Sequence, residues 1–149
     1  MIGIFIALLS GALMSIQGVF NTEVTKQSSL WAANGWVQLT ALLVCVAGWL
    51  MTGRESLAAV FHVEQKYMLL GGVIGAFITF TVIKSMADLG PARAVLLIVV
   101  AQLAVAYLIE LFGIFGVEKQ PLSFRKIIGM GIAILGIVLF KWKLYNRKS

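Results

Sequence analysis

Residues 91–116, PARAVLLIVVAQLAVAYLIELFGIFG, decide the fold class of this chain. From Ala94 to Ile109 the side chains are apolar except for Gln102 and Tyr107. A run of about 20 mostly apolar residues is long enough to cross the hydrocarbon core of a bilayer as a helix. The segment therefore predicts a transmembrane helix.

One acidic residue, Glu110, lies inside this predicted helix. An ionisable side chain at the centre of a membrane helix costs roughly 2.5–3.5 kcal/mol on insertion scales, so it is a functional hypothesis by default. We predict that Glu110 binds a proton and a cationic substrate alternately. The alternative is a structural acid near the helix end that pairs with Lys119 or with a neighbouring loop.

The composition extends this prediction to the whole chain. Of 149 residues, 60% are hydrophobic and only 12% are charged, and the mean hydropathy is +0.98. An average globular protein has about 25% charged residues. The chain is therefore predicted to be an all-α membrane protein with a single transmembrane domain over residues 1–149. The predicted spans cover residues 2–24, 30–52, 67–86, 91–116 and 123–141.

Two pairs of amide side chains flank the connection between the first two spans, which we predict to be a polar turn over residues 22–30. Gln17 and Asn21 are four residues apart, and Asn34 and Gln38 repeat this spacing. Residues four apart lie on one face of a helix, and both pairs belong to the same half of the membrane. Such amides either link helices through hydrogen bonds or contact a substrate, and the sequence leaves both interpretations open.

The fourth span carries two further candidate contacts. Gln102 lies about 16 Å into the helix, near the bilayer midplane, and Glu110 lies about 28 Å in. Tyr107 precedes Glu110 by three residues and so shares its face. Glu110 is the predicted coupling residue, and the four amides, Gln102 and Tyr107 are the predicted substrate contacts.

Small residues mark predicted packing surfaces at Gly11, Gly71, Gly75 and Gly129. In lipid, close approach of helices depends on such residues because the hydrophobic effect does not drive helices together. These surfaces suit a transporter, but they suit equally a non-transporting membrane subunit or assembly factor that holds a larger partner. The two functions differ in whether water reaches the intramembrane polar residues.

Other classes of function have little support. His62 and Cys45 are single, so there is no cluster of metal-ligand residues, and no metal or cofactor is predicted. The intramembrane set also lacks a nucleophile and base pair, so we do not predict an enzyme. The basic and aromatic tail at residues 141–149 is better suited to membrane lipids than to nucleic acid.

The loop charges bear on orientation in the membrane. If there are five spans, five Lys and Arg residues lie on one side and seven on the other, which is a weak bias by the positive-inside rule. Weak bias and an odd number of spans predict an antiparallel homodimer or pairing with a homologous chain of opposite orientation, around a small-molecule substrate. An antiparallel partner would carry its Glu110 to about the depth of the four amides.

The chain also resembles the YdcZ-like family of the drug/metabolite transporter superfamily. The residues that carry the resemblance are Gln17-Gly18-x-x-Asn21, Gly71-Gly72-x-x-Gly75, Leu89-Gly90-x-Ala92, Gln102-Leu103, Glu110-x-Phe112-Gly113-x-x-Gly116, Pro121, Arg125, Gly129 and Gly136. The resemblance implies a five-helix half-transporter, one half of a five-plus-five inverted repeat, related to small multidrug resistance proteins of the bacterial inner membrane. The family pattern has Asp at the acidic position of the fourth span, where this chain has Glu110.

Overall fold

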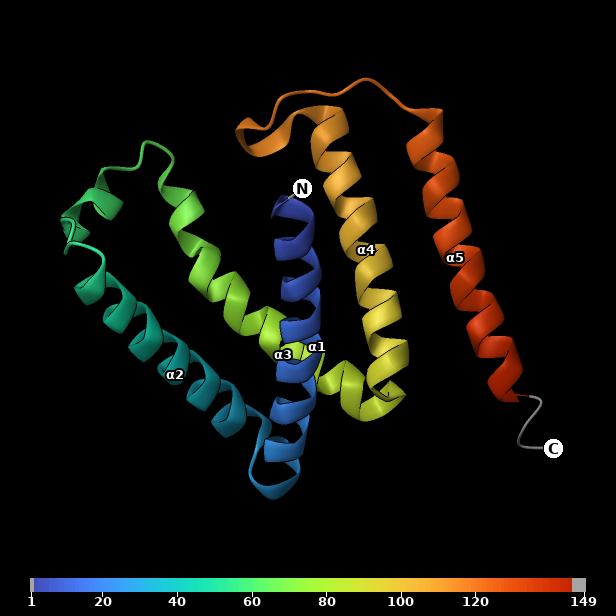
Figure 1. The fold of residues 1–149 in the computed structure, drawn as a ribbon, viewed down its shortest axis with the longest axis horizontal. Coiled ribbons are helices and arrows are strands. Elements are labelled where there is room, and N and C mark those ends of the chain that lie inside the picture. Colours follow the sequence, from blue (N-terminus) through green and yellow to red (C-terminus); the bar gives the residue numbers. More distant parts are fainter. Residues whose placement is uncertain (1, 146–149) are drawn as a thin grey trace. The chain divides into compact units, whose positions relative to one another are not determined.

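The computed structural model describes residues 2–145, and its account of side chains leaves out residues 137, 138 and 140–145. Within this part all regular elements are helical, in agreement with the predicted all-α class (Figure 1). The elements, in chain order, are α1 (Ile2–Gln27), α2 (Leu30–Met51), the 3₁₀ helices Leu57–His62 and Lys66–Leu70, α3 (Gly71–Leu89), α4 (Pro91–Phe112), the 3₁₀ turn Ile114–Gly116 and α5 (Phe124–Tyr145). The chain forms two compact units, residues 1–91 and residues 92–149, which are described separately.

The helix α1 continues beyond its predicted end. A polar turn was predicted over residues 22–30, but the helix runs through Gln27, and only two residues separate it from α2. The hydroxyls of Thr22 and Thr25 donate to the carbonyls of Gly18 and Asn21, both at 2.8 Å, so these polar side chains are satisfied within the helix. The side chain of Ser29 caps α2 by accepting a hydrogen bond from a backbone amide of its first turn.

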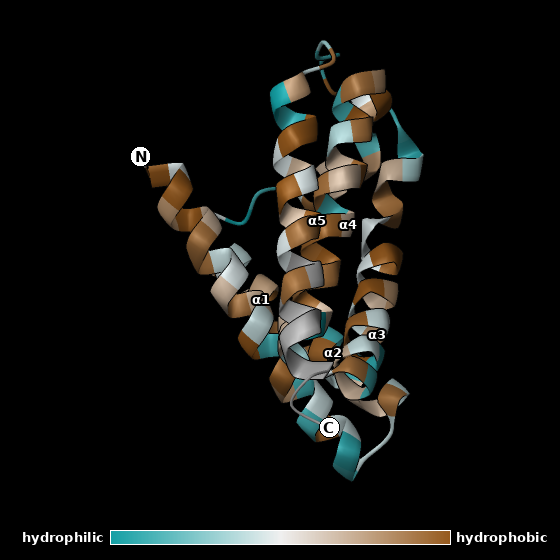
Figure 2. Cartoon of the chain, turned by 90° about the vertical axis from the view of Figure 1, so that its right-hand side faces the viewer, coloured by the Kyte–Doolittle hydropathy of each residue, from teal (hydrophilic) through white to brown (hydrophobic). Residues whose placement is uncertain are grey.

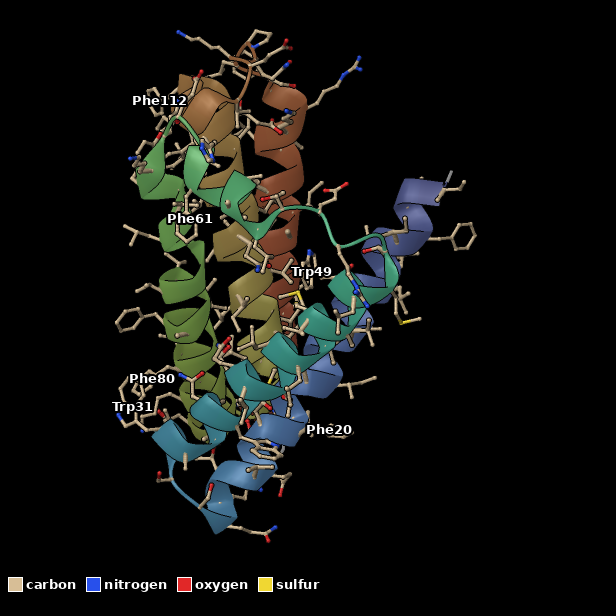
Figure 3. The ribbon with its side chains drawn as sticks, turned by 90° about the vertical axis from the view of Figure 1, so that its left-hand side faces the viewer. Phe20, Trp31, Trp49, Phe61, Phe80 and Phe112 are labelled. Atoms are coloured by element: carbon tan, nitrogen blue, oxygen red, sulfur yellow. The ribbon has the colours of Figure 1, made fainter. Side chains whose placement is uncertain are left out.

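The first unit is held together where α1, α2 and α3 meet. Its most buried side chains come from the second half of α1, the first turns of α2 and the end of α3. Trp31 on α2 lies beside Phe80 on α3, with ring centroids 4.8 Å apart (Figure 3). The helix α3 ends at Gly90, whose φ of +82° is accessible to glycine, and Pro91 then begins α4.

The second unit is the helix pair α4 and α5, which lie side by side (Figures 1 and 2). The fourth span was predicted to reach Gly116, but α4 ends at Phe112. Gly113 adopts a left-handed conformation with φ +66° while its amide still donates to the Ile109 carbonyl. The left-handed backbone of Gly113 terminates the helix, and glycine suits this position because residues with a side chain rarely adopt that conformation.

Large apolar side chains cover the outside of the helices, and the hydrophilic residues gather at helix ends and loops (Figure 2). In the described residues four helices are long and apolar enough to cross a membrane, at Ile2–Gln27, Leu30–Met51, Lys66–Leu89 and Pro91–Phe112. The fifth span was predicted at residues 123–141, where the structure has α5; the side chains of its last part and the basic tail lie outside the described residues. The count of five spans and the five-plus-five repeat stay predictions.

Candidate functional site

Glu110 lies in the last turn of α4 and forms an ion pair with Lys126 in the first turn of α5. The distance from its Oε2 to the Lys126 Nζ is 2.5 Å. Each charge alone would oppose the dipole of its own helix, because α4 ends and α5 begins at this place. The pair offsets both unfavourable interactions. The two side chains are 40% and 47% exposed, so the site is open and not a closed core.

Tyr107 supports this ion pair from one turn earlier on α4. Its side chain is buried, and its hydroxyl accepts a hydrogen bond of 3.0 Å from the backbone amide of Ser123. The Ser123 carbonyl accepts the first helical hydrogen bond of α5, so Tyr107 fixes the point where that helix begins. The Lys126 Nζ lies 5.5 Å from the centroid of the Tyr107 ring, within the range of a cation–π interaction.

A cavity of about 330 Å³ lies at this ion pair. Its volume is at the small end of the range for ligand pockets, and its wall is apolar apart from the three side chains described above. The lining residues are Leu103, Ala106, Tyr107, Glu110, Lys126, Gly129 and Met130. The cavity therefore combines a carboxylate, an ammonium group and an aromatic ring with an apolar surface for a small molecule. Gln102 does not line it and is exposed on α4.

Asn34 and Gln38 on α2 contact α3. The buried Asn34 amide donates to the Ala76 carbonyl at 3.0 Å. The Gln38 amide lies 3.4 Å from the Thr79 hydroxyl and 3.5 Å from the Asn34 side-chain oxygen, so these hydrogen bonds are long. Of the two interpretations left open for the amides, the structure shows helix linking by Asn34, and Gln38 extends the same contact.

Gln17 and Asn21 lie on one face of α1, on an open surface whose other residues also belong to α1. Asn21 is buried at 9% exposure, whereas Gln17 is exposed. No hydrogen bond of either side chain to another described residue is present. Of these two amides only the exposed Gln17 is accessible to another molecule at this surface, whereas Asn34 and Gln38 are engaged with α3.

The close glycine contact within the first unit is at Gly18, which was not predicted as a packing residue. A Cβ at this position would lie 2.5 Å from the Met86 terminal methyl and 3.4 Å from a Val82 methyl. The four predicted packing glycines differ, because a Cβ at Gly11, Gly71, Gly75 or Gly129 would meet no described atom within 4 Å. Close packing of another helix against those four glycines stays a prediction.

The structure thus brings the predicted residues together in three groups: Gln17 with Asn21, Asn34 with Gln38, and Tyr107 with Glu110. Sequence reasoning missed Lys126, which lies near the start of the predicted fifth span, and Thr79. Among the described residues no group of three or more His, Cys, Asp and Glu side chains is arranged to hold a metal ion.

Four apolar helices of spanning length in the described residues define a multi-pass membrane protein. Its small polar sites are the amide contact between α2 and α3 and the ion pair between α4 and α5. The chain belongs to the family described as "Putative inner membrane exporter, YdcZ", whose model matches residues 2–139. No curated protein and no solved structure matches it. This match confirms the predicted family and, with the apolar helices, the multi-pass location in the inner membrane, and the family description supports a transporter role in general terms.

Proposed function

We propose that the chain is a secondary transporter that exports a small organic molecule, and that the cavity at Glu110 is where this molecule binds. One observation carries the proposal: a carboxylate, an ammonium group and a fixed aromatic ring converge on a cavity of about 330 Å³. Few polar groups in an apolar wall are typical of small-molecule sites. The family description supports export as the direction.

In this proposal Glu110 binds a proton and a cationic group alternately. The side chains that face it in the described structure are Lys126 on α5 and Tyr107 on its own helix. A carboxylate that changes partner gives the protein one charge to exchange across the membrane, as intramembrane acids do in pumps and transporters. Coupling of proton movement to substrate movement therefore depends on the Glu110 carboxylate itself and not on the net charge of the protein.

The test is transport in proteoliposomes that enclose a pH-sensitive dye. Gradients of small cations, zwitterions and anions are imposed in turn, and solute movement that changes the internal pH identifies a coupled solute. Glu110→Gln should abolish this pH change, and Glu118→Gln, an acid of the following loop, should leave it intact. Unchanged pH-dependent transport by Glu110→Gln would rule out coupling through this residue, and no movement of any solute by the wild type would rule out the transporter.

We further propose that two chains of opposite orientation form the working unit, either as an antiparallel homodimer or as a pair of homologous chains. The exposed amides Gln17 and Gln102 support this, because a polar side chain facing hydrocarbon without a partner is costly. The weak difference in loop charge supports it as well. Tags at both termini test the arrangement. A homodimer requires each tag on both sides of the membrane, and a single orientation would require a separate partner chain.

A packing subunit without transport is the second candidate, and the hydrogen bond from Asn34 to α3 favours it. Water access separates the two functions. In a chain that carries Cys45→Ser, the variant Gln102→Cys should react with a membrane-impermeant thiol reagent if the chain is a transporter. An unreactive Gln102→Cys, with a reactive cysteine placed at Ser56 as the loop control, would favour the packing subunit.

A further inference from the structure

The ammonium group of Lys126 lies where a ligand cation would be expected to lie. It is 2.5 Å from the Glu110 carboxylate and 5.5 Å from the Tyr107 ring centroid. A carboxylate that supplies opposite charge and an aromatic face that attracts cations are the two features by which proteins bind organic ammonium ions. The chain therefore fills its own cation position with a tethered lysine.

The components of this position differ in their freedom to move. Tyr107 is buried and held by the Ser123 amide, so its ring is fixed. Lys126 has four rotatable bonds and is 47% exposed, so its ammonium group can turn out to water without any change in the helix. The carboxylate and the ring stay in place when it leaves.

We propose that Lys126 is an internal counter-ion and that the substrate is an organic ammonium ion which displaces it from Glu110 and Tyr107. This inference rests on the proposed function, and it names the substrate class of the same cavity. The charge balances in both states, because the carboxylate faces one cation throughout while the lysine is either paired or in water.

Competition between the Lys126 ammonium group and a ligand cation predicts how much the affinity for the ligand should change when the lysine is replaced. The apparent dissociation constant of a ligand equals its intrinsic value divided by the fraction of protein that is free to bind. If the ion pair is formed in ~90% of the molecules, removal of the lysine ammonium group tightens binding about tenfold. A substituent that pairs more strongly with the carboxylate must have the opposite effect.

The experiment is calorimetric titration of the purified full chain in lipid nanodiscs with tetramethylammonium, trimethylglycine and acetate, which are a cation, a zwitterion and an anion of similar size. Lys126→Met keeps the length of the side chain but removes its charge, and should bind tetramethylammonium about tenfold more tightly than the wild type. Lys126→Arg should bind it more weakly, because the guanidinium group pairs bidentately with a carboxylate. Lys119→Met is the matched control for net charge, and Glu110→Gln should not bind it.

Three results would overturn the inference. One is an unchanged or weaker affinity of Lys126→Met for tetramethylammonium, with Lys126→Arg not weaker than the wild type. Another is wild-type binding of trimethylglycine or acetate that Lys126→Met loses, because the lysine would then contact the substrate. The third is no binding of any probe by any variant that retains the wild-type helical circular dichroism. These measurements need no transport, so a wild type that binds tetramethylammonium but moves no solute in proteoliposomes would refute the proposed function and leave the binding result standing.

Discussion

The contact between Gly18 on α1 and Met86 on α3 predicts a specific loss of stability on adding one methyl group. In Gly18→Ala the new Cβ would lie 2.5 Å from the Met86 methyl and 2.7 Å from its sulfur. Ordinary contact between carbon atoms begins near 3.5 Å, so the end of the methionine must move by about 1 Å. Met86 is 3% exposed, so its flexible end must repack within the contact between the two helices. Overpacking of this kind costs about 1–3 kcal/mol, and the flexible methionine makes the lower half of that range the expectation.

The assay is reversible unfolding in mixed micelles, followed by circular dichroism as the fraction of denaturing detergent rises. Gly35→Ala is the matched control, because its Cβ would meet no described atom within 4 Å and alanine is favoured over glycine in helices. The double variant of Gly18→Ala with Met86→Ala should be less destabilised than the sum of the two single variants. Equal stability of Gly18→Ala and Gly35→Ala, or simple additivity in the double variant, would refute the packing described for α1 and α3.

Three further predictions concern the polar groups. Asn34→Leu should lower the free energy of unfolding by about 1 kcal/mol, as for other hydrogen bonds between membrane helices, and no loss would mean that its bond to α3 contributes nothing. Tyr107→Phe should speed hydrogen exchange of the Ser123 amide while changing tetramethylammonium affinity less than twofold, and unchanged exchange would contradict a stabilising hydrogen bond between Ser123 and Tyr107. Exchanging the charges, Glu110→Lys with Lys126→Glu, should restore the stability that either single change lowers, and restored transport would show that the order of the charges is unimportant.

The sequence predicted the helices well but their ends poorly. Hydropathy is summed over long windows, so it placed the apolar runs correctly and had no information on single capping events. The threonine at position 22 was interpreted as the start of a turn, yet its hydroxyl is satisfied within α1, and the helix continues. Gly113 ends α4 through its left-handed backbone, and nothing in hydropathy distinguishes it from Gly116 three residues later.

The candidate site was predicted in part for a similar reason. Glu110 and Tyr107 are three residues apart on one helix, and helical spacing alone places them on the same face. Their partner Lys126 comes from another helix, sixteen residues from Glu110. The alternative interpretation of Glu110 named Lys119, which is closer in sequence. The choice between the two lysines depends on how the chain returns from α4 to α5, and local spacing does not determine that.

The observed position of Glu110 also changes the reason for regarding it as functional. A lone acid in hydrocarbon is conspicuous because it costs roughly 2.5–3.5 kcal/mol, but Glu110 lies in the last turn of its helix, part exposed and paired. Pairing with Lys126 offsets this unfavourable free energy, so the energetic penalty alone is no longer evidence of function. What argues for it is the arrangement around the pair, because a simple surface ion pair needs neither a fixed aromatic ring nor an adjoining apolar cavity.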